Sequence, residues 1–376
     1  MERLFSIFTY ILATVITTTF LLAATTGPAR AEQWDSLIEQ LVSDGLDRTH
    51  VEALFSRPEA QFDPSSMGHK MLRLFRIKYG SCVVRELQAN LLALGYDPGP
   101  VDGFSGFRTR WAISQFQRLH GLPVDGKPSN AVRTVLANSP QRAPEGLLPP
   151  EKPETSPPPT VYPSVFTPSR LAEAQAFFLE NQALLAEIET DYGIPKEIAV
   201  ALLTVETRLG TFLGRKNAFI TLASMAACSE LSQIMPHMDG EQPDAAQRQW
   251  MLTRMGQKAE WAYRELKALI RHCEQNGLDP LAVPGSVYGA VGICQFMPTS
   301  ALEWGVDGDA DGAVNLFVLA DALHSMANYL CDHGWEGDTS TESAQRQALY
   351  SYNHSHTYVN TIMALAAHLK ANGSNS

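Results

Sequence analysis

A single glutamate, Glu206, stands in the apolar run "AVALLTVETRLG", residues 199–210. If the run is a helix, its apolar residues form one stripe and Glu206 lies roughly 70° from the centre of that stripe. Such a helix is normally buried, so the carboxyl either loses its hydration or lines an opening in the core. Apolar surroundings raise the pKa of a carboxyl, and a general acid must stay protonated near neutral pH. Taken alone, the run favours an ion pair between Glu206 and Arg208 or another cation, and a general acid is the alternative.

A second group of chemically capable residues is the acidic segment "DGDADGAVNLFV", residues 307–318. Its spacing matches the first half of a calcium loop, with carboxylates at positions 1, 3 and 5, glycine at 6 and a backbone carbonyl at 7. These positions hold Asp307, Asp309, Asp311, Gly312 and Ala313. Position 12 is Val318 and not the usual glutamate, so the ordinary motif fails at its last ligand. The segment is either a calcium site or a solvated Asp-Gly turn.

A proline-rich segment divides the chain, and both groups of residues follow it. Residues 139–168 contain ten prolines, which predicts an extended linker without regular structure. Before it lie a helical piece, residues 33–80, and a compact unit, residues 81–138. After it, the helix that carries Glu206 is expected to begin at Pro195 and to end at Gly210.

The compact unit contains an internal echo, because Pro-Val-Asp-Gly occurs at residues 100–103 and again at 123–126. Three helical patterns surround these turns, which predicts a small three-helix bundle. The segment "LQANLLALGYDPGPVDGFSGFRTRWAISQFQRLHGLPVDG" closely resembles the sequence of the peptidoglycan-binding domain that accompanies many cell-wall enzymes. This resemblance implies attachment to the cell wall and no chemistry of its own.

The rest of the chain resembles a second family. Glu-Thr-Arg-x-Gly from Glu206, Gly-Ser-x-x-Gly-Ala-x-Gly-x-x-Gln-Phe-Met-Pro from Gly285, the aspartate loop and Tyr-Asn follow one another in this order. They look like the B-type soluble or membrane-bound lytic murein transglycosylases, whose fold is mainly α and lysozyme-like. The implied organisation is a signal peptide (1–31), an N-terminal helical segment of the catalytic domain (32–80), the peptidoglycan-binding domain (81–138), the linker (139–168) and the catalytic domain (169–376).

The family resemblance also implies roles for single residues. Glu206 corresponds to the only catalytic acid and base. The implied substrate-binding residues are Ser286, Gln295, Tyr352, Asn353 and Tyr358, and the tyrosine of the Tyr-Asn segment is implied to hydrogen-bond around the catalytic glutamate and the sugar. The family uses a longer calcium loop, in which Asp321 supplies the last ligand after Asp307, Asp309, Asp311 and Ala313. Cys294 departs from the glycine that often precedes the glutamine, which leaves the exact shape of the cleft open.

The implied reaction cleaves the β-1,4 bond between N-acetylmuramic acid and N-acetylglucosamine without water and leaves 1,6-anhydro ends. The reaction itself requires no cofactor, and a calcium ion would be structural. A hydrolytic muramidase and a non-catalytic cell-wall-binding protein are the alternatives. Ordinary glycosidases need two carboxylates, and the matched motifs supply only Glu206. This favours the transglycosylase.

Composition and the N-terminal residues limit the partners and the compartment. A formal net charge of -11 argues against binding to nucleic acid and favours a neutral or cationic partner. The family resemblance implies glycan strands and stem peptides of peptidoglycan as partners. Arg3, the apolar stretch 4–24 and Ala29-Arg30-Ala31 predict export to the periplasm with cleavage after Ala31, and an uncleaved segment would instead anchor the chain in the membrane. Five cysteines without a spacing pattern leave disulfide pairing undecided.

Overall fold

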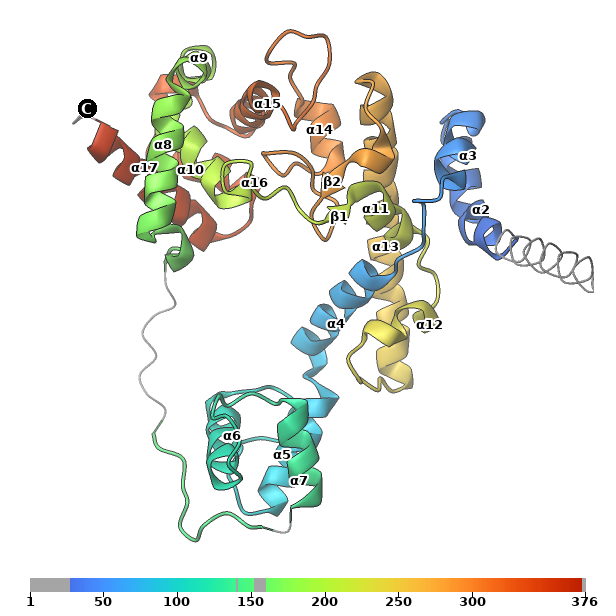
Figure 1. Ribbon diagram of the computed structural model, residues 1–376, viewed down its shortest axis with the longest axis vertical. Coiled ribbons are helices and arrows are strands. Elements are labelled where there is room, and N and C mark those ends of the chain that lie inside the picture. Colours follow the sequence, from blue (N-terminus) through green and yellow to red (C-terminus); the bar gives the residue numbers. More distant parts are fainter. Residues whose placement is uncertain (1–27, 140, 152–159, 374–376) are drawn as a thin grey trace, which may run out of the picture. The chain divides into compact units, whose positions relative to one another are not determined.

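The computed structural model describes residues 28–139, 141–151 and 160–373, so most of the predicted signal peptide lies outside the described residues. Helices dominate this part of the chain, which confirms the predicted mainly α fold (Figure 1). The strands β1 (Lys216–Asn217) and β2 (Pro284–Gly285) pair antiparallel, with Lys216 opposite Gly285. Among the described helices, none combines the length and the apolar character that crossing a bilayer requires.

The chain divides into two compact units. The first combines the described part of Met1–Asp63 with Gly210–Ala227 and Ala259–Met326, and the second combines Pro64–Leu209, Cys228–Lys258 and Ala327–Ser376. The helices of the first unit are α2 (Pro28–Ser43), α3 (Arg48–Ser56), α11 (Ala218–Ala226), η3 (Pro280–Ala282) and α14 (Pro298–Trp304). Two helices, α13 (Ala245–Gln275) and α15 (Leu319–Asp332), contribute residues to both units.

The second unit holds the larger set of helices. They are α4 (Ser65–Tyr79), α5 (Cys82–Ala93), α6 (Phe107–Leu119), α7 (Asn130–Asn138), η1 (Pro163–Val165), α8 (Pro168–Glu180), α9 (Gln182–Tyr192), α10 (Lys196–Thr207), α12 (Leu231–Ile234), η2 (Met235–His237), η4 (Gly337–Thr339), α16 (Glu342–Tyr352) and α17 (His356–Gly373).

Aromatic side chains join the N-terminal helices to the remainder of the first unit. Trp34 of α2 is buried, packs on Phe55 of α3 with ring centroids 5.1 Å apart, and donates from Nε1 to the carbonyl of Ala60 at 3.3 Å. Phe55 in turn packs on Phe219 of α11 at 5.0 Å. Residues 34–55 therefore share a core with residues that follow the linker.

The predicted three-helix bundle is formed by α5, α6 and α7 around a continuous apolar core (Figure 1). Two buried glutamines explain the repeated Pro-Val-Asp-Gly. Gln88 accepts from the amide of Gly103 at 2.8 Å, and Gln117 accepts from the amide of Gly126 at 2.9 Å. Both glycines have positive φ, 83° and 65°, where a side chain would be strained. Each turn is thus held by the glutamine of a neighbouring helix.

The structure shortens the predicted linker. Residues 141–151 contain no helix or strand, as expected, but η1 and the start of α8 lie inside the range 139–168. Proline at a first helical position loses no hydrogen bond, which is why Pro163 and Pro168 begin helices. The amide of Tyr162 donates to Thr361 Oγ1 at 2.9 Å, and Val165 is buried. The prediction of an extended segment up to residue 168 is therefore wrong at its C-terminal end.

A buried carboxylate holds α4, the bundle and the loop before α13 together within the second unit. Glu241 accepts from Arg76 Nε and from the amide of Cys82, both at 2.7 Å. Burial alone would raise the pKa of Glu241, but hydrogen bonds from Ser81, Cys82 and Arg76 outweigh burial and leave the pKa below its usual value. Arg76 also pairs at 2.8 Å with Asp239, whose side chain is 71% exposed.

We expect Glu241→Gln to lower the free energy of unfolding by about 2–3 kcal/mol at pH 7, because an amide NH₂ would face N–H donors in a buried position. Asp239→Asn is the matched control and should cost less than about 1 kcal/mol, because that pair is exposed. A carboxyl whose pKa is lowered by folding stabilises the protein above its unfolded pKa. The difference between wild type and Glu241→Gln should therefore shrink as the pH falls through the folded pKa. Chemical denaturation at several pH values measures both effects, and equal losses for the two variants would contradict this account.

Candidate active site

The helix that carries Glu206 is buried along most of its length. Its residues 198–204 are all buried, and α10 packs against α17 and α8. The structure corrects the predicted bounds, because Pro195 precedes the first helical residue and the helix ends at Thr207. Arg208, Leu209 and Gly210 all have positive φ, 53°, 59° and 82°. The amide of Leu209 closes the helix by donating to the carbonyl of Leu203 at 2.9 Å, so Glu206 lies in the last turn.

The carboxyl of Glu206 is in direct contact with a tyrosine of α17. Tyr358 is 1% exposed, and its hydroxyl donates to Glu206 Oε1 at 2.5 Å. Burial raises the pKa of Glu206 to about 7, against a smaller lowering by the Tyr358 hydrogen bond. Burial and the adjacent carboxyl also raise the pKa of Tyr358 well above its usual value. Glu206 as a whole residue remains partly exposed, although burial is the main influence on its carboxyl.

The structure does not support the ion-pair alternative for Glu206. Arg208 forms its salt bridge with Glu173 of α8, at 2.6 Å from Nη2 to Oε1. The side-chain hydrogen bond from Arg208 is the largest cause that lowers the pKa of Glu173, to about 2. Among the described residues, burial and Tyr358 account for the pKa of Glu206, and no cation contributes.

The other residues predicted from the Tyr-Asn segment, Tyr352 and Asn353, lie at the end of α16 and directly after it. Tyr352, the last residue of α16, packs edge-on against Tyr329, with centroids 5.0 Å apart. Tyr329 donates from its hydroxyl to the carbonyl of Ser351 at 2.9 Å. Asn353 follows the helix and is exposed. Of the three predicted residues, Tyr358 is the one whose hydrogen bond to Glu206 the structure records.

Ser286 and Gln295 belong to the first unit, where they stand in one tightly turned loop. Ser286 Oγ accepts from the amide of Ala290 at 3.0 Å, and Gln295 Nε2 donates to the carbonyl of Gly292 at 3.0 Å. The backbone of Gln295 has φ of 54°, which is uncommon for a residue with a side chain. Both side chains are partly exposed, so they can reach a ligand from a fixed backbone.

Two glycines of the same motif allow this loop to pack. A Cβ on Gly289 would lie 2.7 Å from the side chain of Leu222, and one on Gly292 would lie 2.4 Å from Leu316. Both glycines also have positive φ. Cys294, which departs from the family pattern, is fully buried beside them. None of the five cysteines forms a disulfide within the described part of the chain.

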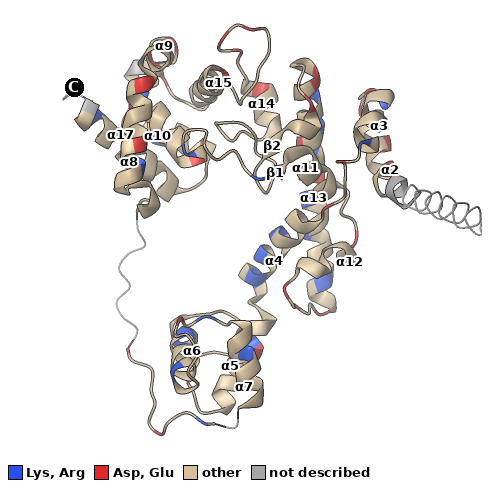
Figure 2. Ribbon diagram, in the orientation of Figure 1, with Lys and Arg blue, Asp and Glu red and all other residues tan. Residues whose placement is uncertain are grey.

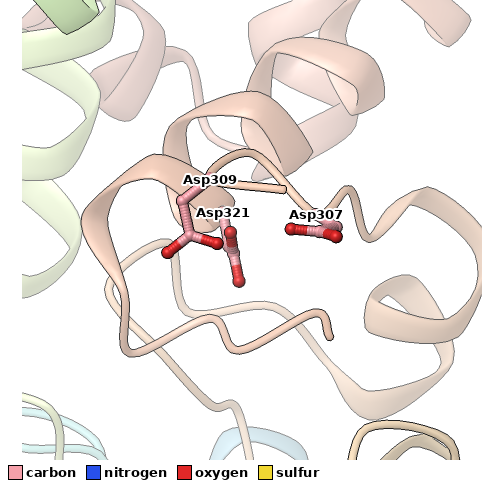
Figure 3. A group of neighbouring side chains, drawn as sticks. All are labelled: Asp307, Asp309 and Asp321. Carbon is pink, nitrogen blue, oxygen red and sulfur yellow. The ribbon is translucent and has the colours of Figure 1, made fainter. Parts of the chain in front are cut away.

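Figure 3 shows three of the predicted calcium ligands turned toward one another. Carboxylate oxygens of Asp307, Asp309 and Asp321 all lie within 4.8 Å of each other. Asp311 is outside this group, and its carboxylate accepts from the amide of Ala313 at 2.9 Å. Asp321 is 1% exposed and accepts from the amides of Gly308 and Asn315 at 2.9 and 2.6 Å.

The electrostatics of this acidic loop are consistent with a cation site. Burial, followed by the negative charges of the neighbouring aspartates, raises the pKa of Asp309. Crowded carboxylate oxygens are the donors that Ca²⁺ prefers, and Gly312 with φ of 94° stands where a calcium loop requires its sharp turn. The residues present therefore fit a calcium ion.

The sequence analysis missed one buried acid that positions the Gln-Phe-Met-Pro motif. Glu265 of α13 is 5% exposed and accepts from both the amide and the hydroxyl of Thr299 at 3.0 Å. It thereby caps the first turn of α14, which follows directly after Met297. The available signal was the same as for Glu206, an acid on the apolar face of a helix.

Comparisons with known proteins identify the families that the chain resembles. The family described as "Transglycosylase SLT domain" matches residues 125–346, and the one described as "Putative peptidoglycan binding domain" matches residues 83–136. Membrane-bound lytic murein transglycosylase B of Escherichia coli is 32% identical over 183 residues, which cover 48% of this chain and 44% of that protein. The chain therefore spans less than half the length of this relative. Spore cortex-lytic enzyme of Bacillus cereus is 41% identical over 56 residues, 15% of this chain and 22% of that enzyme.

Among solved structures, SltB3 from Pseudomonas aeruginosa in complex with NAG-anhNAM-pentapeptide matches with a TM-score of 0.53, 17% identity and coverage of 90% of this chain and 79% of that chain. At this identity the match concerns the fold alone. The first family match covers more than half of the sequence and includes Glu206, Ser286, Gln295 and the aspartate loop. The chain therefore belongs to the transglycosylase SLT domain family.

Proposed function

We propose that this protein is a peptidoglycan lytic transglycosylase. It cleaves the β-1,4 bond between N-acetylmuramic acid and N-acetylglucosamine and leaves a 1,6-anhydro end. The observation that carries the proposal is the partly exposed Glu206, whose pKa burial raises to about 7 and whose Oε1 is held by Tyr358. Such a carboxyl is protonated often enough near neutral pH to donate a proton and is basic enough to take one back.

Glu206 would act twice in this reaction. Because Tyr358 donates to Oε1, the proton of the neutral carboxyl belongs on Oε2, from which it passes to the glycosidic oxygen as the C1–O bond breaks. The resulting carboxylate strengthens the Tyr358 hydrogen bond, since a charged acceptor binds a donor more tightly. The substrate's acetamido group stabilises the oxocarbenium-like centre. The sugar's C6 hydroxyl then attacks C1 and returns its proton to Glu206, and no water is consumed.

The choice of transglycosylase over hydrolase rests on the missing second acid. A retaining or inverting glycosidase places a second carboxyl about 5 to 9.5 Å from the first. At such a distance in a desolvated site, a carboxylate would raise the pKa of its neighbour by charge repulsion. Among the described residues no second acid affects the pKa of Glu206. The C6 hydroxyl is intramolecular and therefore has a high effective concentration.

The proposal extends to the organisation and location of the chain. Residues 32–80 and 169–376 would form the catalytic domain and residues 81–138 would hold the glycan strands, with Ser286, Gln295, Tyr352 and Asn353 contacting saccharide. The packing of Trp34 and Phe55 with Phe219 supports the first assignment. Export to the periplasm rests on the N-terminal sequence.

Digestion of sacculi in heavy-oxygen water tests the reaction. We expect mass spectrometry to find anhydro ends without label, because the leaving group is replaced by the sugar's own hydroxyl. Glu206→Gln should release almost no product, since an amide cannot donate that proton, and its melting temperature at pH 8 should equal or exceed that of wild type because the buried charge is gone. Glu197→Gln removes a charge from the first turn of the same helix and should retain activity. Labelled reducing ends would identify a muramidase instead.

The hydrogen bond from Tyr358 to Glu206 should influence how activity depends on pH. This bond lowers the pKa of Glu206, so Tyr358→Phe should raise that pKa further above its wild-type value of about 7. Activity requires the protonated acid and falls as the pH rises through its pKa. The alkaline limb of the kcat/KM profile should therefore move to higher pH, while the maximal rate drops by about tenfold or more because the carboxylate loses its donor. Tyr263→Phe is the control. The hydroxyl of Tyr263 donates to the carbonyl of Gln40 and to Asp44, so the alkaline limb of this variant should not move. An unshifted alkaline limb in Tyr358→Phe would show that Tyr358 does not influence the pKa of Glu206.

We also propose that the aspartate loop holds a structural calcium ion. Calcium at about 100 times its Kd should stabilise the folded state by about 2.7 kcal/mol, because the ligands are assembled only there. The melting temperature should rise with calcium and fall with a chelator. Asp309→Asn should abolish the response, whereas Glu303→Gln, which removes an exposed charge on α14, should preserve it. A wild-type melting curve that ignores both calcium and chelator would leave the loop as a turn.

A further inference from the structure

The helix α4 carries four positive charges and no negative charge in a protein whose formal net charge is -11. Residues 65–79, which form α4, include Lys70, Arg73, Arg76 and Lys78 and contain no acidic residue. The ribbon of α4 in Figure 2 is accordingly blue at several positions and nowhere red. Burial, and then the charges of Lys258 and Arg73, lower the pKa of Lys70. A positive potential is therefore concentrated on this part of the second unit.

The positive helix borders a groove that also contains exposed apolar side chains. The groove has a volume of about 780 Å³ and is lined by His69, Leu72, Arg73, Arg76, Ile77 and Phe104. Ile77 is 65% exposed and Phe104 is 46% exposed. Phe104 belongs to the first Asp-Gly turn of the bundle, and the amide of Ser81 fixes this turn beside α4 by donating to the carbonyl of Gly103 at 2.9 Å.

The two arginines that line the groove differ in their ion pairs. Arg76 is held by Glu241 and Asp239. Arg73 is exposed, and within the described residues no carboxylate pairs with its guanidinium. An exposed guanidinium next to an aliphatic and an aromatic side chain offers bidentate binding to a carboxylate and an apolar surface for the group that bears it.

We propose that this groove binds an acidic peptide, the stem peptide of peptidoglycan. Arg73 binds a free carboxylate of the peptide, while Ile77 and Phe104 contact its apolar side chains. The proposal rests on the proposed function, which brings the protein to peptidoglycan. It adds a peptide site at the edge of residues 83–136, the range matched by the binding-domain family, because Phe104 lies within that range whereas Arg73 and Ile77 precede it.

The acidic peptide fits the groove better than the other polymers of the envelope. A neutral glycan offers no anion for Arg73. Carboxylate and methyl groups together on a short flexible chain match the guanidinium and the two apolar side chains.

Calorimetry with the full chain tests the proposal. The probe is a synthetic stem pentapeptide without glycan, with free carboxylates, and the comparison probe is the same peptide amidated at each carboxylate. We expect the free peptide to bind and the amidated peptide to bind at least about tenfold more weakly, because the charge-assisted hydrogen bonds are lost. Arg73→Gln and Phe104→Ala should each weaken binding of the free peptide by about tenfold.

Arg142 provides the matched control, because it is an exposed arginine of the segment that follows the bundle and does not line the groove. Arg142→Gln removes the same charge and should leave peptide affinity within about twofold of wild type. Loss of affinity in Arg142→Gln with none in Arg73→Gln, equal binding of both peptides, or capture of anionic vesicles in place of the peptide would each overturn the proposal. Because the probe contains no glycosidic bond, a failure of the proposed cleavage chemistry leaves this result unaffected.

Discussion

The whole candidate site depends on holding one carboxyl inside apolar surroundings. α10 packs on α17 and α8, and every residue from 198 to 204 is buried. This packing brings Glu206 into a place where water no longer favours its charged form, and burial accordingly raises its pKa to about 7. The salt bridge between Arg208 and Glu173 helps to keep the pKa of Glu206 high, because the cation nearest to Glu206 in the sequence pairs with a different acid. Burial of the Glu206 carboxyl costs folding stability, and the same burial gives the carboxyl the raised pKa that its chemistry requires.

The backbone around the functional residues is as unusual as the carboxyl. Residues 208–210 leave α10 in three consecutive left-handed conformations, and Gln295 and Ala310 also have positive φ. Such conformations persist only where surrounding contacts fix them. Here the contacts are identifiable: the Leu209 amide bonds to Leu203, and Gln295 bonds to Gly292 through its own side chain. The polar groups predicted to meet a saccharide therefore stand on rigid turns, so binding need not order them.

Local patterns predicted the fold and much of the site because helices and tight turns are specified by nearby residues. The bundle of α5, α6 and α7 and the helix of Glu206 follow from apolar periodicity, and the grouping of Asp307, Asp309 and Asp321 follows from loop spacing. The family resemblance implied a tyrosine that hydrogen-bonds around Glu206, and the structure identifies it as Tyr358. The choice of Tyr358, the partner of Glu265 and the groove beside Phe104 could not be read from local patterns. Each joins residues more than 20 positions apart, so only tertiary packing decides them. The end of the linker was misplaced because proline both disfavours helix interiors and begins helices.

A single group that is first an acid and then a base needs a pKa near the working pH, and two opposed effects set it here. Burial alone would raise the pKa until Glu206 kept its proton and could not protonate a glycosidic oxygen. A strong donor alone would lower the pKa until the group was ionised before substrate arrived. Tyr358 opposes burial with one neutral hydroxyl, a weaker influence than a cation, and the pKa remains about 7. A lysine or arginine in place of Tyr358 would stabilise the carboxylate too well for proton donation. A neutral donor at the end of a buried helix is therefore the arrangement that lets one carboxyl perform both proton transfers.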